Sequence, residues 1–196
     1  MTHLVLSSTA SDEDAHQHRS RLLEGMAHAV AGRGYAETTI ADIVREASVS
    51  RRTFYEHFGD KAECFIALYE AASRNALQVL REAIDPAHDW EEQVERAIGA
   101  YLRCMAGNPL LMRTLFIEIL GLGPEGLEAR RRMNQEIADY MRAVVGPGKV
   151  TAGLAMAVVG GIHELVLQAI EDGKVDELPK LTRTACALVR AVVQRP

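Results

Sequence analysis

The sequence predicts an all-α protein of about nine helices, and three observations lead to this class. Aromatic residues make up only 5% of the 196 residues, while Ala, Leu, Val, Glu and Arg dominate, which favours helix over sheet. Apolar residues recur at helical spacing through most of the chain. Capping patterns and glycine or proline breaks separate these stretches from one another. With 48% hydrophobic and 25% charged residues, the chain can bury a sizeable core in one or two domains.

The chain is expected to begin with a mobile polar arm, residues 1–15. A first helix is predicted from about Ala15 to Arg33, and Gly32 and Gly34 end it. This helix opens a small N-terminal domain, residues 16–60.

The stretch from Thr38 to Lys61 predicts a short helix, a tight turn, a second short helix and the start of a third. Thr39 to Asp42 is a capping-box pattern that opens the first of these helices. Ser50 can cap the second helix, in which Phe54 and Phe58 share one face. Its other faces are basic and rich in hydrogen-bond donors, so this helix suits the major groove of DNA.

The same stretch resembles the helix-turn-helix of the TetR family of bacterial transcription regulators. The resemblance covers about residues 20–68, and it is carried by Gly32–Tyr35, Thr38–Ile43, Val49-Ser50, Arg51–Tyr55, His57-Phe58 and Lys61. The family usually has glycine in the turn where this chain has Ser48; if that position needs a positive φ, serine costs of order 1 kcal/mol more than glycine. The resemblance implies an N-terminal three-helix DNA-binding domain and a C-terminal helical domain for ligand binding and dimerisation.

The candidate DNA-contacting residues lie at helix starts and along the second short helix: Thr39, Ser50, Arg51, Arg52, Thr53, Tyr55, His57 and Lys61. Arginine favours a bidentate contact with guanine and threonine can meet a thymine methyl group, so Arg51, Arg52 and Thr53 are candidates for reading bases. The resemblance implies that Tyr55 and His57 touch phosphates or base edges and that Lys61 grips the DNA backbone. Three alternatives remain open for this surface: a plain helix cap at Thr39, a packed Tyr55 and a solvated Lys61.

The rest of the chain, residues 61–196, is predicted to be a second helical domain that binds an effector and dimerises. Helices are expected at about Lys61–Ile84, Trp90–Ala106, Leu110–Leu120, Glu125–Val145, Val150–Glu171 and Asp176–Gln194. A capping box at Asp60–Glu63 opens the first of them directly after the helix-turn-helix, so this helix is a natural lever between the two domains.

A ligand pocket is expected among methionine and aromatic residues of the middle helices, because such side chains suit an adaptable apolar cavity. The candidates are Trp90, Tyr101, Met105, Met112, Phe116, Met133, Tyr140, Met141 and His163. Each could instead be an ordinary core residue, and His163 could bond across a dimer interface. The run Arg130-Arg131-Arg132 is expected to be a solvated helix face.

The two C-terminal helices suggest a homodimer, because small residues on one and an apolar face on the other can build a four-helix interface, as in the resembling family. The candidate interface residues are Ala157, Gly160, Gly161, Leu181, Ala185, Leu188 and Val192. Packing within one chain is the alternative. Two helix-turn-helix motifs related by a two-fold axis would read a palindrome.

Charge and cysteine usage limit the other function classes. The net charge is −5 and the pI about 5.8, which argues against a nucleic-acid binder that works by bulk charge. Cys64, Cys104 and Cys186 have no metal or redox spacing, so reduced buried thiols in a cytoplasmic protein are expected. No metal site is expected at His16 and His18, no signal peptide is visible, and no apolar run approaches the roughly 20 residues that span a bilayer.

The sequence therefore predicts a TetR-like transcriptional regulator, most simply a repressor, that binds a double-stranded DNA operator as a homodimer. A small-molecule effector, whose identity the sequence does not reveal, would release it; no other cofactor, no catalytic residue and no membrane partner is expected. The alternatives are a ligand-independent regulator or activator of the same fold, and a helical binding module that does not bind DNA. A helical enzyme is disfavoured, because no Ser/His/Asp, Cys/His or paired-carboxylate arrangement is present.

Overall fold

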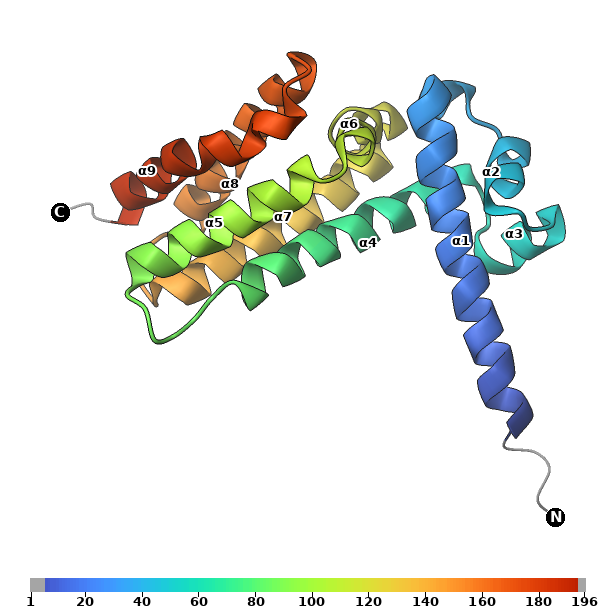
Figure 1. Cartoon of the computed structure of the whole chain (residues 1–196), viewed down its shortest axis with the longest axis horizontal. Helices are drawn as coiled ribbons and strands as arrows, with labels where there is room; N and C mark the ends of the chain where they lie inside the picture. Colours follow the sequence, from blue (N-terminus) through green and yellow to red (C-terminus); the bar gives the residue numbers. More distant parts are fainter. Residues whose placement is uncertain (1–5, 194–196) are drawn as a thin grey trace. The chain divides into compact units, whose positions relative to one another are not determined.

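The computed structural model describes residues 6–193, which form helices and connecting loops without any strand, so the predicted all-α class is confirmed (Figure 1). The chain divides into two compact units, Met1–Tyr69 and Glu70–Pro196. In chain order, the elements are α1 (Leu6–Glu37), α2 (Ile40–Ala47), α3 (Arg51–His57), α4 (Lys61–Glu82), α5 (Trp90–Ala106), α6 (Pro109–Phe116), the 3-10 helix η1 (Glu118–Leu122), α7 (Pro124–Val145), α8 (Ala152–Glu171), the 3-10 helix η2 (Val175–Leu181) and α9 (Thr182–Val193).

The largest differences from the sequence prediction lie in three places. Helix α1 begins at Leu6, well before Ala15, so most of the expected arm is helical; residues 1–5 lie outside the described residues. A 3-10 helix follows α6, and α7 starts at Pro124, which takes the N1 position that proline favours. The expected last helix is divided into η2 and α9, since Pro179 lies inside η2 and has no N–H to donate.

The first unit holds α1, α2, α3 and the start of α4 around a small apolar core. Its largest fully buried side chains include Leu22, Met26, Ile43, Phe54 and Phe65. Gly34 interrupts the regular geometry of α1 with φ 80°, a value that favours glycine, and the chain turns there toward α2.

Helix α1 crosses α2 at Gly25, a close approach that sequence reasoning did not find. A Cβ atom at Gly25 would lie 2.7 Å from the carbonyl oxygen of Ile43 and 2.8 Å from the backbone nitrogen of Ala47. Because these are backbone atoms, they cannot move aside without shifting α2. Only glycine therefore lets the two helices pack at this distance.

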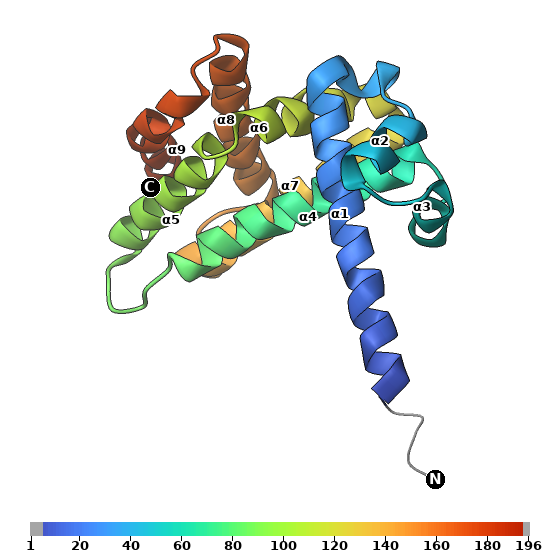
Figure 2. The same ribbon diagram turned by 45° about the vertical axis from the view of Figure 1, so that its right-hand side comes forward.

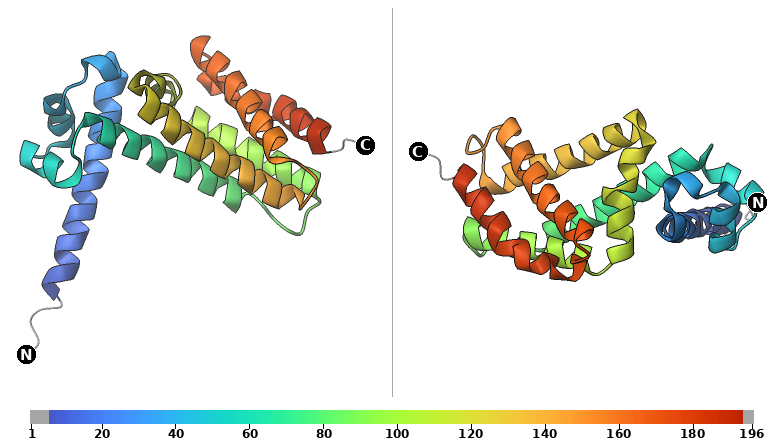
Figure 3. Two further views of the ribbon diagram at one scale, coloured as in Figure 1. Left: turned by 180° about the vertical axis from the view of Figure 1, so that it is seen from behind. Right: turned by 90° about the horizontal axis from the view of Figure 1, so that it is seen from above.

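In the second unit, α7 packs against α8, and α5 packs against η2 and α9. The part of α4 from Glu70 onward runs beside α5 and α7 (Figure 2), and α8 lies next to α9 (Figure 3). Glu70 accepts hydrogen bonds from Arg132 of α7 at 2.6 Å and from Arg74 at 3.4 Å. The bond from Arg132 is the main reason that the pKa of Glu70 is lowered.

Helix α8 is the most apolar element of the described chain. Its 20 residues are long and apolar enough to cross a membrane by length and composition alone, so the expectation that no stretch approaches this length is wrong. Only 33% of its most apolar window is buried within the chain. A helix that packs against a partner helix would meet the same criteria.

The Gly25 contact leads to a prediction about stability. We expect Gly25→Ala to lower the free energy of unfolding of the first unit by about 1–3 kcal/mol, because the new methyl group overlaps the α2 backbone. Gly32→Ala is the matched control in the same helix: its Cβ meets nothing within 4 Å, so stability should stay unchanged or rise by up to ~1 kcal/mol. Urea unfolding curves measure both changes, and equal effects of the two substitutions would contradict the predicted overlap.

Candidate functional site

The start of α2 is fixed by the predicted capping box. Thr39 Oγ1 accepts a hydrogen bond from the Asp42 N–H at 3.2 Å and donates its own proton to Asp42 Oδ2 at 2.6 Å. The Thr39 N–H also donates to the Asp42 carboxylate, at 3.0 Å. These bonds from Thr39, aided by Arg45 and Arg33, lower the pKa of Asp42 to about 2. Thr39 is exposed, but its hydroxyl group already donates its proton to Asp42. A phosphate at this place would therefore bind the free backbone N–H groups at the start of α2.

The turn between α2 and α3 depends on a serine in the left-handed region. Ser48 has φ 52° and ψ 46°, so the position where the resembling family has glycine does need a positive φ. Its carbonyl oxygen accepts a hydrogen bond from Arg21 of α1 at 2.6 Å, and the Val49 N–H returns to the Val44 carbonyl at 3.0 Å. The contact from Arg21 ties the turn to α1, and no sequence pattern indicated it.

Helix α3 has one buried face and one exposed face. Ser50 caps it by accepting from the Thr53 N–H at 3.0 Å, while Phe54 and Phe58 are buried against the rest of the unit. Arg51 and Tyr55 therefore point to solvent.

The exposed face of α3 carries two local charge contacts. The Arg51 guanidinium lies 6.0 Å from the centre of the exposed Tyr55 ring. Arg52, whose side chain is 90% exposed, pairs with Glu56 at 3.0 Å. An exposed pair of this kind is weak, so Arg52 can exchange Glu56 for a DNA group at little cost.

His57 and Thr53 are only partly exposed. The His57 ring lies 6.4 Å from the ring of His18 on α1. Burial, with a further contribution from the charge of His18, lowers the pKa of His57. His57 is therefore mostly uncharged at neutral pH, and a contact with DNA would use a neutral imidazole.

Lys61, the first residue of α4, is held by backbone carbonyl groups. Its Nζ lies 2.8 Å from the oxygen atoms of both Tyr35 and Thr38, 3.4 Å from that of Ala36, and 4.2 Å from the centre of the Tyr35 ring. An ammonium group has three N–H donors, so each has an acceptor within reach. Lys61 thus joins the start of α4 to the α1–α2 connection, and its predicted contact with a phosphate stays a prediction.

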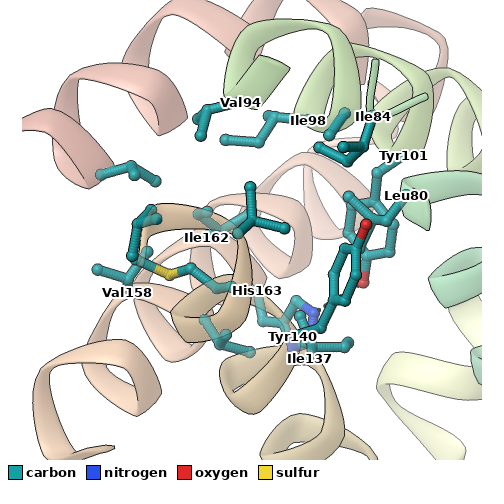
Figure 4. Close-up of a pocket in the computed structure, with 16 residues that line it drawn as sticks. Leu80, Ile84, Val94, Ile98, Tyr101, Ile137, Tyr140, Val158, Ile162 and His163 are labelled. Atoms are coloured by element: carbon teal, nitrogen blue, oxygen red, sulfur yellow. Dashed lines mark hydrogen bonds between the residues drawn. The ribbon is translucent and has the colours of Figure 1, made fainter. Parts of the chain in front are cut away.

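The second unit contains an apolar cavity with about 670 Å³ of empty space, part of it open to solvent. Thirteen of its sixteen lining residues have aliphatic or methionine side chains: Leu80, Ile84, Val94, Ala97, Ile98, Ile137, Met141, Val144, Val145, Val158, Val159, Ile162 and Val189. The other three are Tyr101, Tyr140 and His163, which gather on one side of the cavity in Figure 4. No lining residue carries a charged carboxylate, lysine or arginine side chain.

Four of the nine residues predicted for the pocket line this cavity: Tyr101, Tyr140, Met141 and His163. Trp90, Met105, Met112, Phe116 and Met133 are not among the lining residues. Met105, Met112 and Met133 are buried in the core, and the Phe116 ring lies 5.4 Å from that of His163. Composition alone could not separate a core methionine from one that borders empty space, and it missed the many Val and Ile residues of the wall.

Tyr101 and His163 form the polar contact of the cavity wall. The Tyr101 hydroxyl and His163 Nε2 are 2.9 Å apart and buried. Burial lowers the pKa of His163 to about 4, and the positive charge of Arg130 adds to this effect. His163 is therefore neutral at physiological pH.

The residues predicted for a dimer interface differ in how far they are buried within the chain. Ala185 is fully buried within the chain, and a Cβ at Gly161 would lie 3.1 Å from Leu188, so these residues serve the packing of α8 on α9. Ala157 is exposed, and a Cβ at Gly160 would meet nothing within 4 Å. Leu181, Leu188 and Val192 are half-buried.

The described residues contain no group of three or more His, Cys, Asp or Glu side chains that could hold a metal ion. In the first unit, burial raises the pKa of the Cys64 thiol to about 12, so that thiol is unreactive.

Comparison with known proteins bears on these two sites. Residues 22–68 match the family of bacterial regulatory proteins, tetR family. The predicted resemblance to the TetR family is therefore confirmed for this part of the chain. The fatty acid metabolism regulator protein of Bacillus subtilis is 20% identical over 181 residues, which cover 86% of this chain and 92% of that protein. The transcriptional regulator TtgR of Pseudomonas putida is 32% identical over 128 residues, which cover 65% of this chain but 52% of TtgR.

Solved structures of this family share the fold over nearly the whole chain. FadR from Bacillus halodurans superposes with a TM-score of 0.80 at 15% identity, covering 91% of this chain and 97% of that one. FadR from Bacillus subtilis, solved in complex with stearoyl-CoA, has a TM-score of 0.76 at 17% identity and covers 89% and 97%. The chain therefore shares the fold of these regulators.

The buried His163 leads to a prediction about pH. The unfolded chain binds a proton at His163 below pH ~6.5 and the folded chain only below about pH 4, so the free energy of unfolding should fall as pH drops between these values. The full contribution is about 3 kcal/mol. His163→Gln removes the titrating group, so unfolding measured from pH 7 to pH 4 should show a shallower loss of stability. An unchanged slope would contradict a buried neutral histidine.

Proposed function

We propose that the chain is a transcriptional repressor that binds a palindromic operator as a homodimer and is released by a small-molecule effector. The observation that carries this proposal is the division of α3 into a buried aromatic face and an exposed face with Arg51, Arg52 and Tyr55. A capped helix whose donors project from one side can enter the major groove while its other side stays packed.

We assign the DNA contacts by the chemistry of each side chain. Arg51 and Arg52 would read guanine bases through paired N–H donors, with Thr53 as a further contact. Thr39, Ser50, Tyr55 and His57 would bind phosphates or base edges around them, and Lys61 would do so only by giving up one of its carbonyl partners. Ser50 and Thr53 already share a hydrogen bond of 2.8 Å between their hydroxyl groups, which keeps both at the start of α3.

The surface of α8 supports the homodimer. Gly153, Ala157 and Gly160 repeat at helical spacing, and a Cβ at either glycine would meet nothing within 4 Å. Such a stripe lets another helix approach closely. Because two thirds of the most apolar window of α8 is not buried within the chain, a second copy of α8 and α9 would remove that surface from water.

The cavity of the second unit is the proposed effector site. Its wall is almost wholly aliphatic, so it suits a ligand with an aliphatic part rather than a charged one. Two comparisons support the same class of ligand: a similar Bacillus subtilis protein is named a fatty acid metabolism regulator, and FadR from Bacillus subtilis was solved with stearoyl-CoA. We therefore propose an effector that places an aliphatic chain among these residues.

Helix α4 offers a route from the cavity to the DNA-binding residues. It is continuous from Lys61 to Glu82, its residue Leu80 lines the cavity, and Lys61 holds the connection between α1 and α2. A ligand that displaces the Leu80 end of α4 would act on Lys61 through this continuous helix. The ligand shifts the equilibrium between a DNA-binding state and a released state only if its affinities for the two states differ.

Arginine substitutions in α3 test the DNA-binding proposal. We expect Arg51→Ala and Arg52→Ala each to weaken operator binding by about 1–3 kcal/mol, and the double variant to lose its preference for the operator over unrelated DNA. Arg131→Ala, an exposed arginine of α7, is the control and should leave binding unchanged. Fluorescence anisotropy at fixed salt measures the affinities, with circular dichroism to check folding. A folded double variant with unaltered operator affinity would rule out α3 as the recognition helix.

A further inference from the structure

One face of α7 changes in character from charged to apolar along its length. Arg130, Asn134, Ile137 and Met141 are spaced by four, three and four residues, so they lie on one stripe of the helix. Ile137 and Met141 line the cavity. Asn134 and Arg130 precede Ile137 by about one and two turns of α7, and Ile137 lies near His163 in Figure 4.

Asn134 is a buried amide without a partner. Its residue is 6% exposed, and its Oδ1 has no hydrogen bond within the described part of the chain. Leaving such an atom unpaired is costly, and native proteins rarely do so without a functional reason. A residue that only filled the core at this place would be expected to be apolar.

Arg130 is half-buried, and it differs from the two arginines that follow it in exposure and in its partners. Arg131 is exposed, and Arg132 pairs with Glu70 and Glu128, whereas no carboxylate of residues 14–193 lies within ion-pair distance of Arg130. The expectation that all three form a solvated face is therefore wrong for Arg130. Its charge acts on His163, which lines the cavity and whose pKa it helps to lower. Arg130 therefore lies on the same stripe of α7 as the cavity-lining Ile137, and its charge acts on the cavity-lining His163.

We propose that the effector is a carboxylic acid with an aliphatic chain, which places its chain in the cavity and its carboxylate between Arg130 and Asn134. This inference rests on the proposed effector site and adds the head group to it. The Arg130 guanidinium and the Asn134 amide both donate hydrogen bonds to a carboxylate, and the amide can turn to present its NH2 group.

The same arrangement disfavours other head groups. The Tyr101 hydroxyl bonds to His163, and His163 is neutral, so the imidazole adds no second positive charge to the site. In a thioester or an alcohol, the group at the end of the aliphatic chain carries no negative charge, so it would leave Arg130 unpaired. Binding should therefore select a free acid over its uncharged analogues.

Calorimetric titration with dodecanoic acid and 1-dodecanol at pH 7.5 tests the head group. We expect the acid to bind at least roughly tenfold more tightly than the alcohol, the gain of one charge-assisted hydrogen-bonded pair. Arg130→Gln should remove this preference while alcohol binding stays unchanged, which also shows that the variant is folded. Arg131→Gln is the matched control and should keep the preference.

Asn134→Leu separates a binding role from a structural one. Because leucine removes an unsatisfied buried atom, we expect Tm without ligand to rise by roughly 2–4 °C while affinity for the acid falls. Gln135→Leu, at an exposed position of the same helix, should leave acid binding unchanged. A lower Tm with unaltered acid affinity would make Asn134 a structural residue and overturn its part in the proposal.

The outcomes distinguish this inference from the proposed function. Equal affinities of acid and alcohol for the unchanged chain, or tighter binding of dodecanoyl-CoA than of the acid, would overturn the head-group assignment and leave the aliphatic effector site standing. If neither the acid, the alcohol nor the thioester binds, the proposed effector class fails together with the inference.

Discussion

The ammonium group of Lys61 is the contact on which the first unit depends most. It binds the carbonyl groups of Tyr35 and Thr38 at 2.8 Å each, so the first residue of α4 fixes both the end of α1 and the approach to α2. The turn after α2 is held to α1 from the other side by Arg21, and Gly25 lets the two helices touch. Since α3 follows that turn directly, these few contacts determine where its exposed side chains lie.

Charge placement, rather than total charge, suits this unit to DNA. Residues 16–61 contain seven Lys and Arg residues against six Asp and Glu residues. Several of these cationic side chains already have partners within the protein: Arg33 and Arg45 pair with Asp42, and Lys61 binds carbonyl groups. The cations of α3 remain on the surface, where only the weak Glu56 pair competes with DNA for Arg52. The acidic remainder of the chain would discourage binding to unrelated DNA.

Local patterns in the sequence predicted the local structure well, whereas contacts between residues far apart in the sequence could not be predicted. The caps at Thr39 and Ser50 could be predicted because each bonds to a residue three positions away. The partners of Arg21 and Lys61 lie 27 and 23–26 residues away, so no spacing rule indicates them. The cavity was predicted in the right unit from methionine and aromatic residues, but its wall is mainly Val and Ile, which are equally common in a filled core. The place of Arg130 on the stripe of Ile137 and Met141 could have been found, because the three residues are spaced by seven and four.

The central claim is that two copies of this TetR-family chain read a symmetric DNA site through α3. Incubating the purified chain with a library of genomic fragments and sequencing the bound pool tests it most directly. The account predicts an enriched palindrome whose half-sites are about one helical turn, roughly 34–36 Å, apart. Weak binding that falls with salt and enriches no motif, both with and without dodecanoic acid, would contradict it.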